Sequence, residues 1–578
     1  MGMAILETAS VASIMPFLAV LGNPQMLENN AVLKVIYTHT QGLGVSTPDD
    51  FLIVLGVGVF VLIVVSAAYR IFTQYVMNRF IEMRRHSISA RILETYLRQP
   101  YEFFLDRNSG EMSKTILSEV DQVIANVFRP AYNMMGFSLV VVCLTVLMIV
   151  VDPLLAFLAA GLIGGLYVLI FAGIKRRLLH LGEALVSSNK ERFMAAGEAL
   201  GGIKDIKLLG REDSYLCRFK GYSKQFSSII ASQITLNQVP KYAIEALAFG
   251  GIIVIILVLM VTEGGISSAA LGQILPIVGL YAFAAYRLQP AIQAMFQGFA
   301  SLRYGQKAVD NLYADMHPDN SPKPFPEQAP KALKAKRLIA LKHLSYTYPK
   351  ATKPTLIDLN LEIPVGSSVG LVGSTGAGKT TVVDVILGLL RPTKGAITVD
   401  GNPVTDEQLR AWQQSLGYVP QDIFLTDTSV AENIALGMPK IQIDQEQVER
   451  CARMAQVHEF ITNELPNQYE TLVGERGVRL SGGQRQRIGI ARALYHNPEV
   501  LVFDEATSAL DTVTERAVME AIDALAHQKT IILIAHRLST VKNCDQIVML
   551  EKGQIKAKGK FDELAQVDQQ FREMAFHV

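Results

Sequence analysis

The chain is poor in charge, and its charge is balanced. Only 19% of its 578 residues are charged, and 54 Lys and Arg against 53 Asp and Glu leave a net charge of +1. A nucleic-acid partner is therefore not expected, since binding to the negatively charged phosphates favours a strongly basic protein. The four cysteines have no C-x-x-C or metal-like spacing. We interpret them as small hydrophobic residues buried in a reducing compartment.

Half of the residues are hydrophobic, and in the first half of the chain they gather into long apolar runs. As helices, these runs can cross about 30 Å of hydrocarbon. Six spans are predicted, at residues 2–21, 51–72, 132–151, 154–174, 242–261 and 271–288. The first contains Glu7 and Pro16. We interpret it as a transmembrane helix with a short or missing lead-in, because a signal peptide needs a charged n-region and a cleavage site.

Lys and Arg gather in two long loops, residues 73–131 and 175–241. Basic loops stay on the cytoplasmic side, so both loops and both termini are predicted to be cytoplasmic. Helix periodicity continues through most of each loop, at residues 87–99, 112–129, 178–200 and 213–238. The loop tips, residues 100–110 and 202–213, mix turn formers with apolar residues. This favours docking elements, with ordinary solvated turns as the alternative.

Residues 317–336 are polar and rich in proline, which is typical of a linker. The predicted domains are therefore a membrane domain at residues 1–316, this linker, and a soluble α/β domain at residues 337–578.

GSTGAGKTT, residues 373–381, fits the phosphate-binding pattern G-x-x-x-x-G-K-[ST]. It lies between a predicted buried strand at 367–372 and a predicted helix at 381–390, the context that the pattern requires. Its glycines let backbone N–H groups form an anion site at a helix N-terminus. Lys379 adds positive charge for the β- and γ-phosphates, and the Thr380 hydroxyl can ligate Mg²⁺. The predicted ATP-binding residues here are Gly373, Ser374, Thr375, Gly376, Ala377, Gly378, Lys379, Thr380 and Thr381.

EVLVFDEAT, residues 499–507, predicts a second buried strand that ends on two carboxylates. Asp504 can hold the Mg²⁺ shell, and Glu505 is free to orient or deprotonate water. A solvated loop start is the alternative, and the upstream glycine loop argues against it. Residues 530–536 predict a further strand that ends at His536.

RLSGGQRQRIGIARAL, residues 479–494, places small residues at the start of a predicted helix. This is a second anion site in the same domain. One ATP cannot use both sites of one chain if they lie on opposite sides, whereas two chains facing each other could use them together.

LSGGQ, GSTGAGKT, VLVFDE and the isolated His536 together resemble the ATP-binding cassette (ABC) family, in the expected order along the whole chain. The resemblance implies a six-helix α-helical exporter membrane domain joined to an α/β P-loop nucleotide-binding domain. It further implies a homodimer of such half-transporters that hydrolyses ATP with Mg²⁺. Each ATP would lie between the phosphate loop of one chain and LSGGQ of the other.

The resemblance also implies roles for single residues. Tyr348 would stack on adenine, and Gln421, the Q-loop residue, would join Thr380 and Asp504 around Mg²⁺. Glu505 would act on the attacking water, and His536 would contact the γ-phosphate. The signature that contacts ATP in trans would be Leu480, Ser481, Gly482, Gly483 and Gln484, and the D-loop would be Ser508, Ala509, Leu510 and Asp511. The two loop tips would be coupling helices.

The membrane half resembles bacterial flippases for lipid-linked oligosaccharides, the protein glycosylation K type, in LETASVASIMPFLAVL, VPKYAIEALAFG and YRLQPAIQAM. This implies that a polyprenyl-diphosphate-linked glycan is flipped across the bacterial inner membrane. Charges inside a membrane are costly and usually functional, so Arg70, Lys241 and Arg287 could line a basic cavity for the diphosphate. Alternatively, Lys241 could pair with Glu245, and Arg70 could reach the interface.

Two other interpretations stay open. A multidrug or general lipid exporter would use the same ATPase. A soluble cassette ATPase working on DNA or ribosomes is a different class, and the apolar spans and basic loops argue against it.

Overall fold

The computed structural model describes residues 2–22, 35, 37–40, 47–151, 153–262, 268–316, 330–474, 477–505, 512–526, 528–535 and 537–576. The chain separates into two compact units. The first is Met1–Gln99 with Arg107–Lys323, and the second is Pro100–Asp106 with Pro324–Val578. Most of the predicted linker, residues 317–329, lies outside the described residues.

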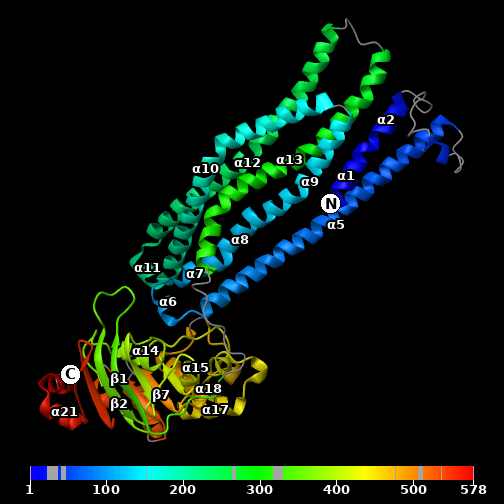
Figure 1. Ribbon diagram of the computed structural model, residues 1–578. Coiled ribbons are helices and arrows are strands. Elements are labelled where there is room, and N and C mark those ends of the chain that lie inside the picture. Colours follow the sequence, from blue (N-terminus) through cyan, green and yellow to red (C-terminus); the bar gives the residue numbers. More distant parts are fainter. Residues whose placement is uncertain are drawn as a thin grey trace. The chain divides into compact units, whose positions relative to one another are not determined.

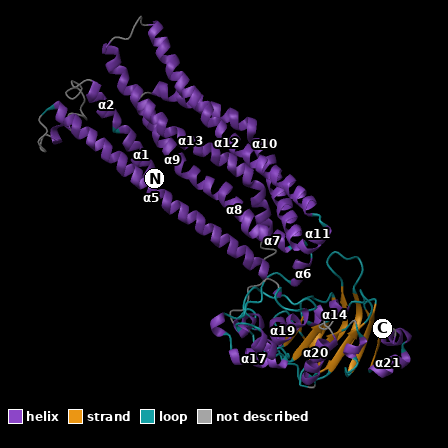
Figure 2. Cartoon of the chain, turned by 180° about the vertical axis from the view of Figure 1, so that it is seen from behind, coloured by secondary structure: helices purple, strands orange, loops and turns teal. Residues whose placement is uncertain are grey.

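The first unit is helical throughout its described part (Figure 1). Its main helices are α1 (Gly2–Ala12), α2 (Ile14–Gly22), α5 (Pro48–Leu97), α9 (Arg129–Val151), α10 (Pro153–Gly201), α12 (Glu212–Thr262) and α13 (Ser268–Met316). Helices α10, α12 and α13 run side by side in both views (Figure 2). All six predicted spans fall on helical backbone, apart from Ser13 in the first. Among the described residues, two helical runs are long and apolar enough to cross a membrane, Asp49–Leu97 and Gly110–Val151, and Gly2–Leu18 is a shorter apolar run.

The first predicted span is not one helix, because the backbone breaks at Ser13 between α1 and α2. Pro16 has no N–H to donate to the carbonyl of Ala12, so the regular hydrogen-bond ladder is interrupted there. The prediction of a single continuous helix at residues 2–21 is therefore wrong in this detail.

The predicted helical extensions beyond the spans are confirmed in α5, α10 and α12. The run that leads into α9 is less regular. It consists of α7 (Ser109–Lys114), the π-helical turn η1 (Thr115–Glu119), α8 (Val120–Val123) and a second π-helical turn, η2 (Ile124–Phe128). Ser89 of α5 donates its hydroxyl to the carbonyl of Ile116 at 3.0 Å. A buried ion pair joins Lys114 Nζ to Glu119 Oε1 at 2.6 Å, and Ile116 lies between these two residues in the sequence.

Glycines allow α13 to approach α9 and α10 very closely. A Cβ atom added at Gly182 of α10 would lie 2.2 Å from the backbone oxygen of Tyr304 in α13. A Cβ at Gly298 of α13 would lie 2.2 Å from Met134 Cγ in α9. At Gly182 the helices are therefore packed backbone to backbone, whereas at Gly298 the Met134 side chain fills the space that a Cβ would take.

The second unit contains two sheets. The antiparallel sheet has the order β2-β1-β4-β5, formed by β1 (Leu338–Tyr346), β2 (Leu356–Pro364), β4 (Lys394–Val399) and β5 (Asn402–Pro403). The larger sheet has the order β10-β9-β3-β8-β7-β6, formed by β3 (Ser368–Val372), β6 (Leu416–Val419), β7 (Val500–Asp504), β8 (Thr530–Ile534), β9 (Gln546–Glu551) and β10 (Gln554–Gly559). Strands β3, β6, β7, β8 and β9 are parallel, so their carboxyl ends lie along one edge.

The helices of the second unit alternate with its strands along the chain, except for α6, which comes from the loop between α5 and α7. They are α6 (Tyr101–Leu105), α14 (Lys379–Ile386), α15 (Leu409–Gln413), α16 (Val430–Ile434), α17 (Gln445–Met454), α18 (His458–Glu464), α19 (Gly482–Tyr495), α20 (Thr512–Leu525), α21 (Phe561–Val567) and α22 (Gln569–Phe576). The core includes the fully buried Trp412 of α15, whose indole N–H donates to the carbonyl of Ile386 at 2.7 Å. This bond holds α15 against the end of α14.

Three strands predicted around the phosphate site are confirmed as β3, β7 and β8. The helix predicted at residues 381–390 starts earlier and ends at Ile386. Gly388 takes a left-handed φ of +66°, a conformation that ends helices. The apolar residues beyond Ile386 therefore continue the hydrophobic pattern without continuing the helix.

We expect Gly182→Ala to lower the stability of the first unit by about 1–3 kcal/mol, because its Cβ meets backbone atoms of α13 that cannot move aside. Thermal unfolding of the full chain in nanodiscs, followed by circular dichroism, measures the effect. The matched control is Gly197→Ala on the same helix, where an added Cβ meets no atom within 4 Å. That change should keep or raise stability, by up to about 1 kcal/mol. Equal melting points for the two variants would contradict the close packing.

Candidate nucleotide site

The phosphate loop joins β3 to α14 in the geometry that the sequence predicts. Gly373, Gly376 and Gly378 all take positive φ values, +151°, +81° and +102°. At Gly373 a Cβ would also lie 2.3 Å from the backbone oxygen of Leu550. Only glycine meets both conditions at this position, and the curled loop that results is the backbone shape of an anion-binding nest.

Lys379 is buried, and its ammonium is held by the loop itself. Nζ donates to the carbonyl oxygens of Gly373 at 2.7 Å and Ser374 at 3.3 Å. Burial lowers the pKa of Lys379 below its usual value, and the carboxylates of Glu505 and Asp504 act against that shift. A positive charge of this kind is well placed to exchange neutral carbonyl partners for phosphate oxygens.

Asp504 and Glu505 stand at the carboxyl end of β7, two strands from β3 in the sheet. Asp504 is buried, and Glu505 has a left-handed φ of +49°. A non-glycine residue in this region is strained and is often found at functional sites. Glu505 accepts a hydrogen bond of 2.7 Å from the amide of Gln421. The structure therefore brings together two predicted site residues that are 84 positions apart.

Tyr348 and Thr381 are also brought together, with their hydroxyl oxygens 3.2 Å apart. Sequence analysis missed two neighbours of the carboxylates. Burial and then the Asp504 carboxylate raise the pKa of Asp384, on α14, to about 6. The hydroxyl of Tyr418 on β6 donates to Asp504 at 3.4 Å. Tyr418 could not be predicted, because the sequence does not reveal that its strand, β6, lies next to β7 in the sheet.

The signature residues form the start of α19. Ser481 caps this helix: its hydroxyl accepts from the N–H of Gln484 at 3.2 Å, and its own N–H donates to the Gln484 side chain at 2.8 Å. Gly482 and Gly483 make the first turn, so N–H groups with no helical partner lie next to small side chains. Leu480 is buried behind them.

The D-loop residues Ser508, Ala509, Leu510 and Asp511, and the predicted γ-phosphate contact His536, lie outside the described residues.

Comparison with known proteins gives two family matches that cover both units. Residues 17–282 match the model of the ABC transporter transmembrane region, and residues 356–508 match the ABC transporter model. An ATP-dependent lipid A-core flippase of Cupriavidus pinatubonensis is 30% identical over 85% of this chain and 81% of that protein. The chain belongs to the ABC transporter family.

Further similarities agree with this assignment. The heterocyst differentiation ATP-binding protein HepA of a Nostoc species is 33% identical over 80% of this chain and 74% of that protein. A solved structure, described as a bacterial Atm1-family ABC exporter with ATP bound, superimposes with a TM-score of 0.74 and covers 98% of this chain and 97% of that one, at 24% identity. The chain thus has the fold of an ABC exporter, and it is a membrane protein whose ATPase is coupled to transport.

Two of the three predicted basic residues of this ABC transporter have acidic partners in the helical unit. Arg70 Nη1 lies 3.4 Å from Oε1 of the buried Glu7, and Lys241 Nζ lies 3.9 Å from Glu245 Oε1. Gln289 of α13 donates to the same Glu245 oxygen at 3.1 Å. The alternative that Lys241 pairs with Glu245 is therefore present in the structure.

Arg287 differs from the other two. Its guanidinium lies over the Phe283 ring, 5.5 Å from the centroid, and its buried Nε has no hydrogen-bond partner among the described residues.

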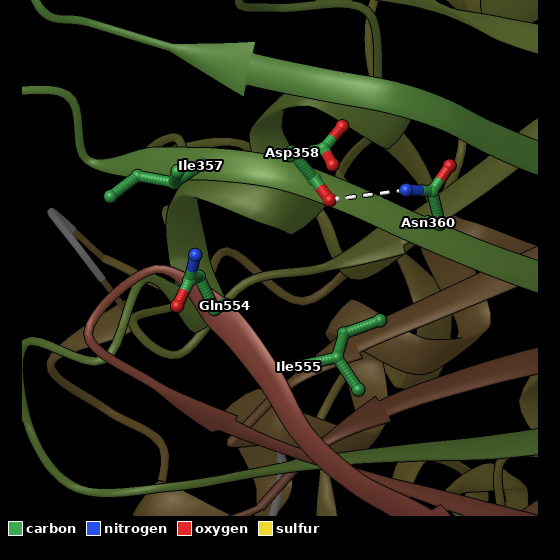
Figure 3. Close-up of a pocket in the computed structure, with 5 residues that line it drawn as sticks. All are labelled: Ile357, Asp358, Asn360, Gln554 and Ile555. Carbon is green, nitrogen blue, oxygen red and sulfur yellow. Dashed lines mark hydrogen bonds between the residues drawn. The ribbon is translucent and has the colours of Figure 1, made fainter.

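A pocket of about 360 Å³ lies between β2 and β10, the edge strands of the two sheets (Figure 3). It is lined by Ile357, Asp358, Asn360, Gln554 and Ile555, and none of these is a predicted site residue. Beside it, Gly553 donates its N–H to the carbonyl of Ala377 at 3.0 Å and accepts from Ile357 at 2.9 Å. This pocket therefore adjoins the turn that supports the phosphate loop.

We expect Lys379→Ala to weaken ATP binding by at least about tenfold, which is about 1.4 kcal/mol, because the phosphates lose their buried cation. Equilibrium binding of a fluorescent ATP analogue to the purified protein measures it. Lys394→Ala, an exposed residue of β4, is the control and should bind normally. Unchanged affinity in Lys379→Ala would count against the phosphate cradle.

Proposed function

We propose that this ABC exporter is a flippase for an anionic lipid, in which ATP hydrolysis moves a polyprenyl-diphosphate-linked glycan, or a lipid of similar head group, from the cytoplasmic to the outer leaflet of the bacterial inner membrane. The observation that carries the proposal is the set of cations on its apolar helices, Arg70, Lys241 and Arg287. The alternative is a multidrug or general lipid exporter with the same ATPase.

The incomplete pairing of these cations supports an anionic cargo. A charged side chain at membrane depth costs several kcal/mol unless it is paired. Among the described residues, Arg287 Nε has no hydrogen-bond partner, and the contact between Lys241 and Glu245 is long, at 3.9 Å. A diphosphate offers negative charge and several acceptor oxygens, which suit the forked donors of arginine. The name of the Cupriavidus relative, a lipid A-core flippase, favours a lipid cargo of this general kind.

For the ATPase, we propose that the phosphate loop from Gly373 to Thr381 binds ATP, with Tyr348 against adenine. The residues present fit a magnesium ion, since the hydroxyl of Thr380, the amide of Gln421 and the carboxylate of Asp504 supply the oxygen ligands that it prefers. When bound, the ion would neutralise charge that develops on the phosphates. Among the described residues no group of three or more His, Cys, Asp or Glu could hold a metal, and a magnesium ion shared with ATP does not need one.

Glu505 is then the residue placed to orient the attacking water and accept its proton. Its carboxylate accepts a hydrogen bond from the Gln421 amide at 2.7 Å, which helps to fix the orientation of the carboxylate. His536 is proposed to contact the γ-phosphate, and Ser508, Ala509, Leu510 and Asp511 to form the D-loop.

The two loop tips support the coupling of this ATPase to the membrane helices in a homodimer. The first tip, α6, belongs to the second unit, where Glu102 accepts from the Tyr346 hydroxyl at 3.1 Å and Asp106 pairs with Lys350 at 3.1 Å. The second tip, α11 (Ile203–Leu209), leaves Leu208 84% and Leu209 68% exposed. We propose that α11 docks on the nucleotide-binding domain of a second copy, which would cover these leucines.

The domain limits that we propose are 1–316 for the membrane domain, 317–336 for the linker and 337–578 for the nucleotide-binding domain, with both termini cytoplasmic. A nucleic-acid partner is not expected.

We expect Glu505→Gln to lower kcat for ATP hydrolysis by at least about 100-fold, the contribution of a general base, and to trap an ATP-bound closed dimer. Phosphate release gives the rate, and native mass measurement gives the number of copies. Glu520→Gln, at an exposed position of α20, is the control and should hydrolyse ATP at the wild-type rate. Wild-type turnover in Glu505→Gln would remove Glu505 from its role, and a complex found only with a different half-transporter would exclude the homodimer.

The cargo is tested by ATPase activity in nanodiscs, titrated with a polyprenyl-diphosphate glycan and, separately, with hydrophobic drugs. If the proposal holds, only the diphosphate lipid stimulates hydrolysis, and alanine at Arg70, Lys241 or Arg287 lowers its apparent affinity by about tenfold, as expected for loss of a charged hydrogen bond.

The matched control is Arg79→Ala, an exposed arginine further along α5, which should respond as wild type. Stimulation by drugs alone, with no effect of the three alanines, would instead identify a general exporter whose basic residues are structural.

A further inference from the structure

The segment that begins with Gln421 has no regular secondary structure between β6 and α16, so its backbone groups depend on side chains for partners. Asn433 of α16 is fully buried and supplies several of them. Its amide donates to Thr426 O at 3.0 Å, to Thr428 Oγ1 at 3.2 Å and to Ser429 O at 3.1 Å. Its oxygen accepts from Thr426 N at 3.0 Å. The later half of the segment is therefore fixed to α16.

The earlier half is fixed to α19, the helix that begins at the signature. Arg492 Nη1 donates to the carbonyl of Phe424 at 2.8 Å. The same guanidinium donates through Nε to the Asn433 carbonyl at 2.8 Å and through Nη2 to its side-chain oxygen at 3.3 Å. These acceptors are all neutral. Burial lowers the pKa of Arg492 to about 10, as expected for a cation removed from water among neutral groups.

A glycine on the same face of α19 makes an independent close contact with the segment. A Cβ at Gly489, one helical turn before Arg492, would lie 2.4 Å from Ile423 Cδ1 and 3.0 Å from its Cγ1. On the other side, a Cβ at Gly477 would lie 2.6 Å from Leu425 Cδ1. Ile423, Phe424 and Leu425 are thus held against α19 and the turn before it.

We infer that Arg492 is a positioning residue for ATP hydrolysis: it fastens the segment after Gln421 to the signature helix, so that Gln421 and Glu505 are aligned only when α19 is in place. This inference rests on the proposed function, which gives Gln421, Glu505 and the signature their roles. The forked guanidinium is required, because one side chain must reach two chain segments at once.

The physical consequence is a link between the two anion sites of the domain. The start of α19 presents the signature, and Arg492 near its other end holds the Phe424 carbonyl, three residues from Gln421. Gln421 in turn donates to Glu505. A displacement of α19 on meeting ATP would therefore move the group that holds Glu505.

The first test is Arg492→Lys, which keeps the charge and loses the fork. We expect kcat for ATP hydrolysis to fall about tenfold with KM changed less than about twofold, the pattern of an interaction that serves the transition state. Hydrogen exchange should rise in residues 421–428 and stay unchanged in α14. Arg453→Lys, on α17, is the control, because Arg453 is an arginine of the same unit that pairs with Glu449 of its own helix at 2.9 Å. It should keep wild-type kcat and exchange.

Two outcomes would overturn the inference. One is wild-type kcat in Arg492→Lys. The other is a fall in kcat accompanied by faster exchange throughout the second unit, which would make Arg492 a stability residue only. Failure of the proposed function is distinguishable, since the wild-type protein itself would then not hydrolyse ATP.

A second variant keeps the inference testable if Arg492→Lys does not fold. Gly489→Ala should push Ile423 and its segment away from α19 and lower kcat while leaving Arg492 unchanged. Combining it with Ile423→Ala removes the obstructing atoms and should restore kcat. Wild-type kcat in Gly489→Ala, or no recovery in the double variant, would contradict the inference.

Discussion

The burial of one ammonium group organises the nucleotide-binding unit. Lys379 can remain charged away from water only because the loop bends back and gives it the carbonyls of Gly373 and Ser374. That bend requires glycines with positive φ. The backbone of Leu550 also lies too close to Gly373 to leave room for a side chain, and the turn at Gly553 lies next to Gly378. The parallel order of β3, β8 and β7 then brings the carboxylates of β7 to the same edge of the sheet. A cation and two acids thus share one site.

The helical unit depends on apolar packing rather than on a buried charge. Its helices come together through glycines and aliphatic side chains, and some charges on its apolar spans are compensated by one another, as in Glu7 with Arg70. A hydrogen-bond donor such as Arg287 Nε, which has no partner among the described residues, is then a group that a polar cargo could stabilise. The same helices approach closely enough at Gly182 and Gly298 that a shift of one would require its neighbours to move with it.

Much of this was predictable from sequence, because local patterns carry it. The phosphate loop is contiguous, its strand and helix are marked by apolar periodicity, and the spans are marked by length. Contacts between distant segments were not predictable. Asp384 and Tyr418 look like ordinary helix and strand residues, yet each acts on Asp504. The bond between Arg492 and Phe424 joins residues 68 positions apart and has no local signal. The break at Ser13 could have been predicted from Pro16.

Trp412 has a practical consequence beyond packing. It is the single tryptophan of the chain, and its fully buried indole N–H is bonded to the last residue of α14, the helix that starts at Lys379. The protein therefore carries a native fluorophore rigidly attached to its phosphate-binding helix. Its emission reports the surroundings of that helix against a background free of other indoles, in the full-length protein and without labelling.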